Sequence, residues 1–244
     1  MRIFFQQYFD THIIRENFSY VLDGFWQTVQ LALISAVLAL IVGLVLALVR
    51  AAPGRGMLPL RALAISYIDV MRGIPLLLVV LLISGSFPAL DFLPHWLRAP
   101  DMLGKPDIFW YGVLAIALTY SAYYAEVYRA GIEAVPLGQL EAARSLGMSR
   151  AVAMRHVIVP QAVRKVIPPM LNDFIALMKD TSLVGVIALL EVVEAGRTVQ
   201  AETFNSSALT LAAFLFVLVT IPLARIVDRQ ISREQLRMQR GVVT

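Results

Sequence analysis

The sequence predicts an all-α membrane protein with about five transmembrane helices. Of its 244 residues, 59% are hydrophobic, and the mean hydropathy is +0.73, which is higher than a soluble domain with a water-facing surface allows. Apolar runs long enough to cross a bilayer recur along the chain, and no charged residue occurs between Gln30 and Arg50. Lysine and arginine gather in some of the segments between these runs and are scarce in others, which is typical of membrane proteins.

The composition argues against several other classes of protein. Without a cysteine, the chain can form neither a disulfide framework nor a cysteine metal site. We expect no histidine metal site either, because His12, His95 and His156 are far apart in sequence and none has a partner at ligand spacing. The formal charge of +4 is better explained by basic residues placed beside the apolar runs than by nucleic-acid binding.

The first span is preceded by a different kind of segment. Residues 1–23 mix aromatic and charged side chains, which is typical of an amphipathic segment at the membrane interface. The first span is expected over residues 24–49. A basic turn follows over residues 50–56, where Pro53 and two glycines break any helix. We place this turn in the cytoplasm.

The second span, residues 58–86, is interrupted by polar and helix-breaking residues. Arg72, Gly73 and Pro75 stand in its middle, and an apolar run resumes at Leu76. A proline at this depth removes a backbone donor, so we expect the helix to be bent or unwound there. A long outer loop with four prolines follows over residues 84–107.

The remaining spans are expected over residues 108–130, 166–190 and 208–224, with a short outer segment at residues 191–207. The first two of these spans carry ionisable side chains, whereas the last does not. Beyond it, residues 225–244 have an arginine every three or four positions, which is typical of a basic amphipathic tail.

The distribution of Lys and Arg predicts the orientation. Fourteen of the 21 flank the side of the 50–56 turn and the tail, and five flank the opposite side; Arg72 and Lys179 remain inside. The excess marks the cytoplasmic side. The amino terminus is therefore expected outside and the carboxyl terminus in the cytoplasm. Residues 24–224 form one membrane domain between the outer segment 1–23 and the tail 225–244.

Six charged side chains fall within the expected spans. A charge at the bilayer centre costs roughly 2.5–3.5 kcal/mol even on a lenient scale, so each should be paired or line a hydrated cavity. Asp69 and Arg72, three residues apart, could neutralise each other. Asp173 lies near the inner interface, where a hydrated or capping role is expected. The six are Asp69, Arg72, Glu126, Asp173, Lys179 and Asp180.

Three of these positions offer a binding role beside a structural one. An unwound turn at Arg72 would free backbone groups suited to an α-carboxylate and α-ammonium, although a kink with a snorkelling arginine is the alternative. Glu126 could hold a ligand ammonium or form an ion pair with Arg72 or Lys179. Adjacent positions point in different directions on a helix, so at most one of Lys179 and Asp180 faces a given cavity.

Between the third and fourth spans lies a soluble insert, residues 135–162, that reads as two short helices meeting at a break. Pro136 suits a first helical turn, Gly147 suits a left-handed end, and Ser149 can cap the next helix, which Pro160 is expected to close. Leu140, Ala143 and Leu146 would share a face of the first helix. Composition alone allows a simple connecting loop.

The pattern Glu141-Ala142-Ala143, Gly147 and Ile158-Val159-Pro160 resembles the EAA loop of ATP-binding-cassette (ABC) importer permeases, with Val159 in place of the usual leucine. The resemblance implies that this insert, which we call the knuckle, couples the chain to a separate ATPase. The coupling residues it implies are Leu140, Glu141, Ala142, Ala143, Leu146, Gly147 and Ser149.

Three further stretches, residues 72–77, 122–132 and 179–184, look like the signatures of polar amino acid ABC permeases, the histidine/glutamine/glutamate group with a MetI-like transmembrane domain. With residues 22–28, the resemblance spans nearly the whole chain; the 84–107 loop is longer than in short relatives. It implies five spans, a second permease, homologous or identical, two ATPase subunits, an extracytoplasmic binding protein and a bacterial inner-membrane location. The substrate-binding residues it implies are Arg72, Gly73, Pro75, Glu126, Lys179 and Asp180.

The function predicted is therefore that of a permease subunit carrying a polar amino acid: glutamate or aspartate, glutamine, or a basic amino acid. No GxxxxGK[ST] motif occurs, so we expect a non-catalytic chain that binds no cofactor, with ATP and Mg used by the partner ATPase. Partners would be protein, amino acid and lipid, not nucleic acid. The alternative is a secondary transporter driven by an ion gradient, with Glu126 and Asp180 as a relay. No HExxH or nucleophile elbow supports an intramembrane enzyme.

Overall fold

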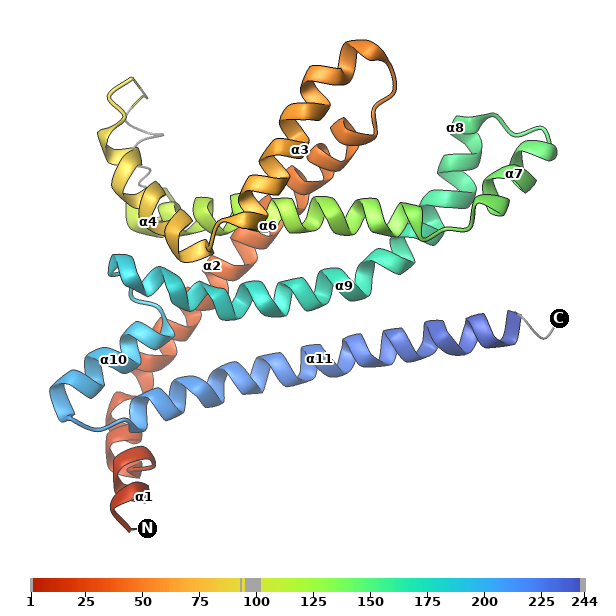
Figure 1. The fold of residues 1–244 in the computed structure, drawn as a ribbon. Coiled ribbons are helices and arrows are strands. Elements are labelled where there is room, and N and C mark those ends of the chain that lie inside the picture. Colours follow the sequence, from red (N-terminus) through yellow and green to blue (C-terminus); the bar gives the residue numbers. More distant parts are fainter. Residues whose placement is uncertain (1, 93, 95–101, 242–244) are drawn as a thin grey trace.

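A computed structural model describes residues 2–92, 94 and 102–241 of the chain (Figure 1). Within these ranges all regular secondary structure is helical, and the only β-type pairing is an isolated bridge between Met102 and Lys105. The all-α class predicted from the sequence is therefore confirmed. Residues 93 and 95–101 of the 84–107 loop, which include His95, and the last three residues of the tail lie outside the described residues.

The first long helix is longer than expected. A short helix, α1 (Arg2–Tyr8), precedes α2 (Thr11–Ala51). Asp10 caps α2 by accepting a hydrogen bond from the backbone N–H of His12 at 2.9 Å. The 41 residues of α2 extend about 60 Å, so the helix is twice as long as a hydrocarbon core of about 30 Å. Residues 11–23 thus belong to the same unbroken helix as the first span.

The predicted interruption of the second span is confirmed. A turn of 3-10 helix, η1 (Arg55–Met57), leads into α3 (Leu58–Gly73), and α4 (Leu76–Ser86) follows at an angle of 108°. Ile74 and Pro75 between them are extended. Pro75 lacks an N–H and disfavours helical geometry in the residue before it, so the helix ends at this point. The next segment, η2 (Phe87–Ala89), begins the outer loop.

The central helix is α6 (Asp107–Glu133), which packs against α2, α3, α4 and α9. Its pairing with α2 is the most extensive among the described elements. Gly43 makes this pairing possible, because a Cβ there would lie 2.8 Å from the carbonyl oxygen of Ser121 and 2.9 Å from Cβ of Tyr124. The two helices can approach closely only where α2 has no side chain.

The substitution Gly43→Ala is therefore expected to lower the free energy of unfolding by about 1–3 kcal/mol, because a methyl group would force two packed helices apart. Denaturant unfolding of the purified protein in detergent measures this loss. Gly56→Ala is the matched control, since a Cβ at that position meets nothing within 4 Å. Equal stability of the two variants would show that the close approach of α2 and α6 is wrong.

The knuckle begins with α7 (Leu137–Ser145) and continues through α8 (Arg150–Ala153). Gly147 adopts the predicted left-handed conformation, with φ of +84°, and Ser149 caps α8 by accepting from the N–H of Val152 at 3.4 Å. The predicted end at Pro160 is wrong. Helical structure passes through one π turn, η3 (Met154–Ile158), directly into α9 (Val159–Asp180). Pro160 is the second residue of α9, directly after the π turn, so its missing N–H falls at the junction of the two helical segments.

By length and composition, three helical stretches of the described chain can cross a membrane: Ile3–Ala51, Asp107–Glu133 and Ser207–Ser232; the bent pair α3–α4 makes a fourth. The helix α9 does not qualify on that criterion, because its charged residues include Arg164, Lys165 and Asp173. The predicted count of five spans requires that α9, the fourth span in chain order, also crosses the membrane, so this count stays a prediction.

The end of the molecule opposite the knuckle is built from η4 (Thr181–Ile187), α10 (Val192–Thr203) and the start of α11 (Ser207–Gly241). The buried carboxylate of Glu191 caps α10 by accepting from the N–H groups of Val193 at 2.9 Å and Glu194 at 2.7 Å. The N–H of Val192, the first residue of α10, donates instead to the hydroxyl of Thr28 in α2 at 3.1 Å. Figure 1 shows α10 and the knuckle at opposite ends of α9.

Candidate functional site

A cavity of about 520 Å³ lies beside the break between α3 and α4. Its volume falls within the roughly 300–1,000 Å³ of small-molecule sites. Residues 72–76 form one wall, and α6 and α9 form the others. The side chains contributed by those two helices are Thr119, Tyr120, Tyr123, Asp173, Ala176 and Asp180, and Leu183 of η4 completes the lining.

Aromatic groups of α6 position the charged groups of the cavity. The guanidinium of Arg72 lies over the ring of Tyr123, 5.8 Å from its centroid, which is a favourable cation–π distance. The hydroxyl of Tyr120 donates a hydrogen bond to Oδ2 of Asp180 at 2.7 Å. The two tyrosine rings are 5.6 Å apart. A positive group and a negative group are thus held side by side on one aromatic pair.

Two other polar residues of the cavity, Thr119 and Asp173, make no hydrogen bond or ion pair with the residues that the structure describes. Thr119 is 3% exposed, and its hydroxyl makes no hydrogen bond with any described group. Asp173 is half-buried, and no hydrogen bond or ion pair among the described residues reaches its carboxylate. The sequence-based interpretation gave Asp173 a hydrated or capping role and missed its place here. Its spacing of seven residues from Asp180, two helical turns, is the signal that could have found it.

Of the six residues predicted to bind substrate, the structure brings Arg72, Gly73, Pro75 and Asp180 together in the lining of the cavity. Lys179 is exposed and does not line it. The proposed neutralisation of Asp69 by Arg72 is not found among the described ion pairs, and Arg72 faces Tyr123 instead.

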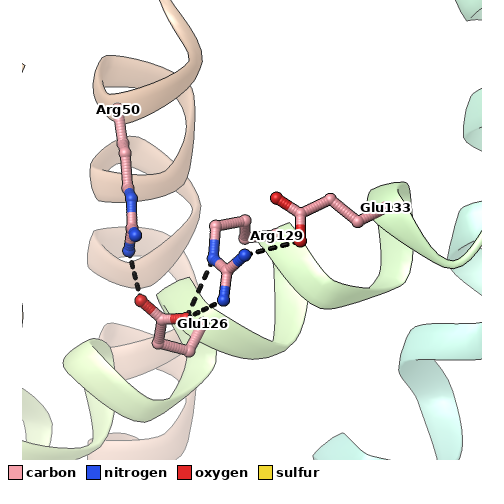
Figure 2. Close-up of polar contacts among 4 residues, drawn as sticks. All are labelled: Arg50, Glu126, Arg129 and Glu133. Carbon is pink, nitrogen blue, oxygen red and sulfur yellow. Dashed lines mark hydrogen bonds and ion pairs between the residues drawn. The ribbon is translucent and has the colours of Figure 1, made fainter.

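Glu126 lies outside the cavity, in an ion-pair cluster that joins α2 to α6 (Figure 2). Its carboxylate pairs with Arg50 of α2 and accepts from Nη2 of Arg129 at 2.7 Å; Arg129 also donates to Glu133 at 2.5 Å. The partners suggested from the sequence, Arg72 and Lys179, are wrong. Arg50 reaches Glu126 because α2 continues to Ala51, whereas the sequence placed Arg50 in a loop.

Of the seven predicted coupling residues, two pack inside the knuckle and five are exposed. Ala143 is buried, and Leu140 packs against the small core of Val135, Ile158 and Ala162. Leu146 does not share their face, because α7 ends at Ser145, and its side chain is 80% exposed. Glu141, Ala142, Gly147 and Ser149 are also exposed.

A second hollow, of about 660 Å³, opens on the outer side of the knuckle. Charged and polar side chains form most of it, and α7 and the start of α8 supply all of them. They are Leu140, Glu141, Arg144, Ser145 and Arg150. The exposed Leu146 lies directly after this segment, so the outer knuckle combines an apolar tip with charges of both signs, as docking surfaces do.

Comparison with known proteins also indicates a membrane component of a transport system. Residues 43–234 match the family described as "Binding-protein-dependent transport system inner membrane component". The chain is 34% identical over 218 residues, 87% of this chain and 92% of the other, to the "Probable glutamine ABC transporter permease protein GlnM" of Bacillus subtilis (strain 168).

Two solved structures have the same fold. One, described as an amino acid ABC transporter with histidines, is similar with a TM-score of 0.77 and 32% identity, covering 90% of this chain and 96% of its own. The other, the MetNI methionine ABC transporter in an inward-facing conformation, has a TM-score of 0.68 at 15% identity, covering 86% of this chain and 94% of its own. At 15% identity, the similarity to the second structure shows a shared fold and nothing more.

Proposed function

This chain belongs to the family of binding-protein-dependent transport system inner membrane components, and from that premise we propose that it forms half of the pathway through which an ABC importer moves a polar amino acid. It is a multi-pass permease of the inner membrane and a non-catalytic transport subunit. Hydrolysis of ATP, with Mg, belongs to a partner ATPase.

The observation that carries the substrate class is the pairing of opposite charges beside an unwound turn. Every amino acid has an α-carboxylate and an α-ammonium. Arg72 can hold the first through a charge-assisted hydrogen bond, and Asp180, fixed by Tyr120, can hold the second. The extended Ile74 and Pro75 expose backbone groups to the same space. Gly73 has open space where a Cβ would be, so the substrate can approach the backbone.

The proposed topology has five spans, with the amino terminus outside and the carboxyl terminus in the cytoplasm. The cytoplasmic excess of Lys and Arg supports this orientation. The fourth of these spans is α9, whose charges would be covered by the cavity and by a second permease subunit, a copy or a relative of this chain. An extracytoplasmic binding protein would deliver the amino acid to the end formed by η4 and α10.

The knuckle is the proposed coupling element, and its packing suits a lever. The two helices that it joins are held to each other beside it: Lys165 of α9 donates to the carbonyl of Ala134, directly after α6, at 2.8 Å, and Gly131 of α6 has no Cβ where Val166 of α9 packs. Closure of the ATPase around the exposed outer side of the knuckle would then move α6 and α9 together, and with them two walls of the cavity.

Reconstitution tests this function. The purified complex with its ATPase and binding protein is placed in lipid vesicles, and uptake and ATP hydrolysis are measured for a panel of amino acids. Uptake should require ATP. Uptake that continues without the ATPase subunit would contradict the proposal and favour a transporter driven by an ion gradient.

Arg72→Ala is expected to reduce amino acid uptake by about tenfold or more, because a hydrogen bond to a charged group contributes about 1.5–3 kcal/mol. Arg55→Ala is the matched control, since Arg55 is an exposed arginine of η1 that does not line the cavity. The control should transport at the original rate. Equal activity of the two variants would remove Arg72 from the binding site.

A further inference from the structure

We propose that the transported amino acid carries a positive charge on its side chain and that Asp173 is the residue of the membrane cavity that selects this charge. The inference rests on the proposed function and narrows its substrate class from polar to basic amino acids. It depends on the charge balance of the cavity, on the lack of a partner for Asp173 and on the spacing along α9.

The cavity has one acidic group more than an amino acid backbone requires. Apart from the tyrosines, its ionisable lining groups are Arg72, Asp173 and Asp180. Lys179 points elsewhere and is exposed, and Glu126 is occupied by two arginines outside the cavity (Figure 2). After Arg72 and Asp180 balance the α-carboxylate and α-ammonium, Asp173 remains. A cationic side chain would neutralise it.

The surroundings of Asp173 differ from those of Asp180. Asp180 accepts a hydrogen bond from Tyr120, whereas no described residue donates to Asp173. An unpaired carboxylate at membrane depth is costly, and such residues mark ligand or ion pathways. Glutamine would leave this carboxylate without a counter-charge, and glutamate would add a second negative charge beside it. Arginine or lysine would supply the missing cation.

The spacing suits a substrate with two separated cations. Asp173 and Asp180 are seven residues apart on one face of α9, which places their Cα atoms about 10 Å apart along the helix axis. A basic amino acid has its α-ammonium and its distal cation at the two ends of a flexible hydrocarbon stem. It can therefore place the α-ammonium near Asp180 and extend the other cation toward Asp173.

Thr119 gives independent support for a ligand at this position. Thr119 of α6 lines the cavity, and its buried hydroxyl lacks a hydrogen-bond partner among the described residues. A buried hydroxyl without a partner is unfavourable, so a polar substrate group is expected to complete it. The lining thus contains two polar groups, Thr119 and Asp173, that form no hydrogen bond with any residue in the described ranges.

Direct binding tests the proposal without the contribution of the binding protein. The permease with its ATPase subunits is purified in detergent, and the affinities for arginine, lysine, glutamine and glutamate are measured by isothermal titration calorimetry. Arginine or lysine should bind at least about tenfold more tightly than glutamine, and glutamate most weakly. Asp173→Asn should remove that preference while changing the affinity for glutamine by less than about threefold.

Two further variants distinguish a role of Asp173 in selecting the substrate from a role in stabilising the fold. Asp69→Asn is the matched control, because it removes an exposed acidic group of the same kind outside the cavity, and it should keep the preference for basic amino acids. Asp173→Glu retains the charge and should keep the preference as well. If Asp173→Asn does not fold, the ranking by the unmodified complex and the Asp173→Glu variant still decides the matter.

Each other outcome has a definite meaning. Glutamine or glutamate binding as tightly as arginine would overturn the basic class and leave the permease function intact. An equal loss for all amino acids in Asp173→Asn would make Asp173 a structural residue and refute its selecting role. Failure of every amino acid both to bind the complex and to be taken up would overturn the proposed function itself.

Discussion

Replacing Gly147 with valine is expected to leave ATP hydrolysis running while amino acid uptake falls by about tenfold or more. Gly147 ends the helix α7 with φ of +84°, a conformation that costs L-residues about 1–2 kcal/mol and is more unfavourable for a β-branched side chain. Valine would shift the backbone toward negative φ and redirect the exposed Leu146 beside it. The ATPase would then close on a knuckle of altered shape. Parallel measurement of uptake and hydrolysis in vesicles tests this expectation.

Gly138→Val provides the matched control within the same knuckle. Both glycines have open space where a Cβ would lie, but φ lies in the left-handed region only at Gly147. Because valine is a better helix former than glycine, the control should gain slightly in helix propensity at α7 and change little else. Its uptake and hydrolysis should therefore stay coupled. Coupled uptake in Gly147→Val at the original level would show that the shape of the knuckle does not transmit the motion.

The substitution Glu126→Gln is expected to lower the free energy of unfolding by about 1–3 kcal/mol, because it leaves two arginines without their shared counter-charge. The side chains of Glu126 and Arg50 are 16% and 27% exposed, so water compensates only in part; Arg129 is more exposed, at 38%, which limits its share. Denaturant unfolding in detergent measures the loss. Amino acid affinity should change by less than about threefold, since Glu126 does not line the cavity.

Glu133→Gln is the control for this cluster. Glu133 also pairs with Arg129, but its side chain is 61% exposed, and exposed ion pairs contribute about 0–1 kcal/mol. The difference between the two variants isolates the link from α6 to α2. A Glu126→Gln variant of normal stability that binds amino acids poorly would instead restore the role in substrate binding that the sequence suggested for this residue.

Features encoded by a few adjacent residues were predictable from the sequence. The break at Gly73-Ile74-Pro75 follows from the backbone limits that proline imposes, and the left-handed turn at Gly147 and the cap at Ser149 follow from local preferences. Pro160 shows the limit of this reasoning. A proline can end one helix or begin another, and only the packing of α9 decided between them.

Features that depend on packing between distant segments were not predictable. Arg50 reads as a loop residue because it follows a run of apolar residues, yet α2 continues past it and brings it against Glu126, 76 positions away. Which face of α9 meets the cavity also depends on packing. Only the placement of α9 against α6 shows that Asp180, and not Lys179, lines the cavity. The same placement identifies Asp173 as a lining residue.

Cysteine labelling of the knuckle tests most directly whether a separate ATPase drives this chain. The protein has no native cysteine, so Leu146→Cys and Phe204→Cys introduce single thiols at positions that are 80% and 85% exposed, at the knuckle and at the opposite end. The measurement is the rate of maleimide labelling in the permease alone and in the complex with its ATPase, without the binding protein. Assembly should slow labelling at position 146 by about tenfold or more and leave position 204 unchanged. Equal rates at position 146 in both samples would mean that the ATPase does not engage the knuckle, and the mechanism would be wrong.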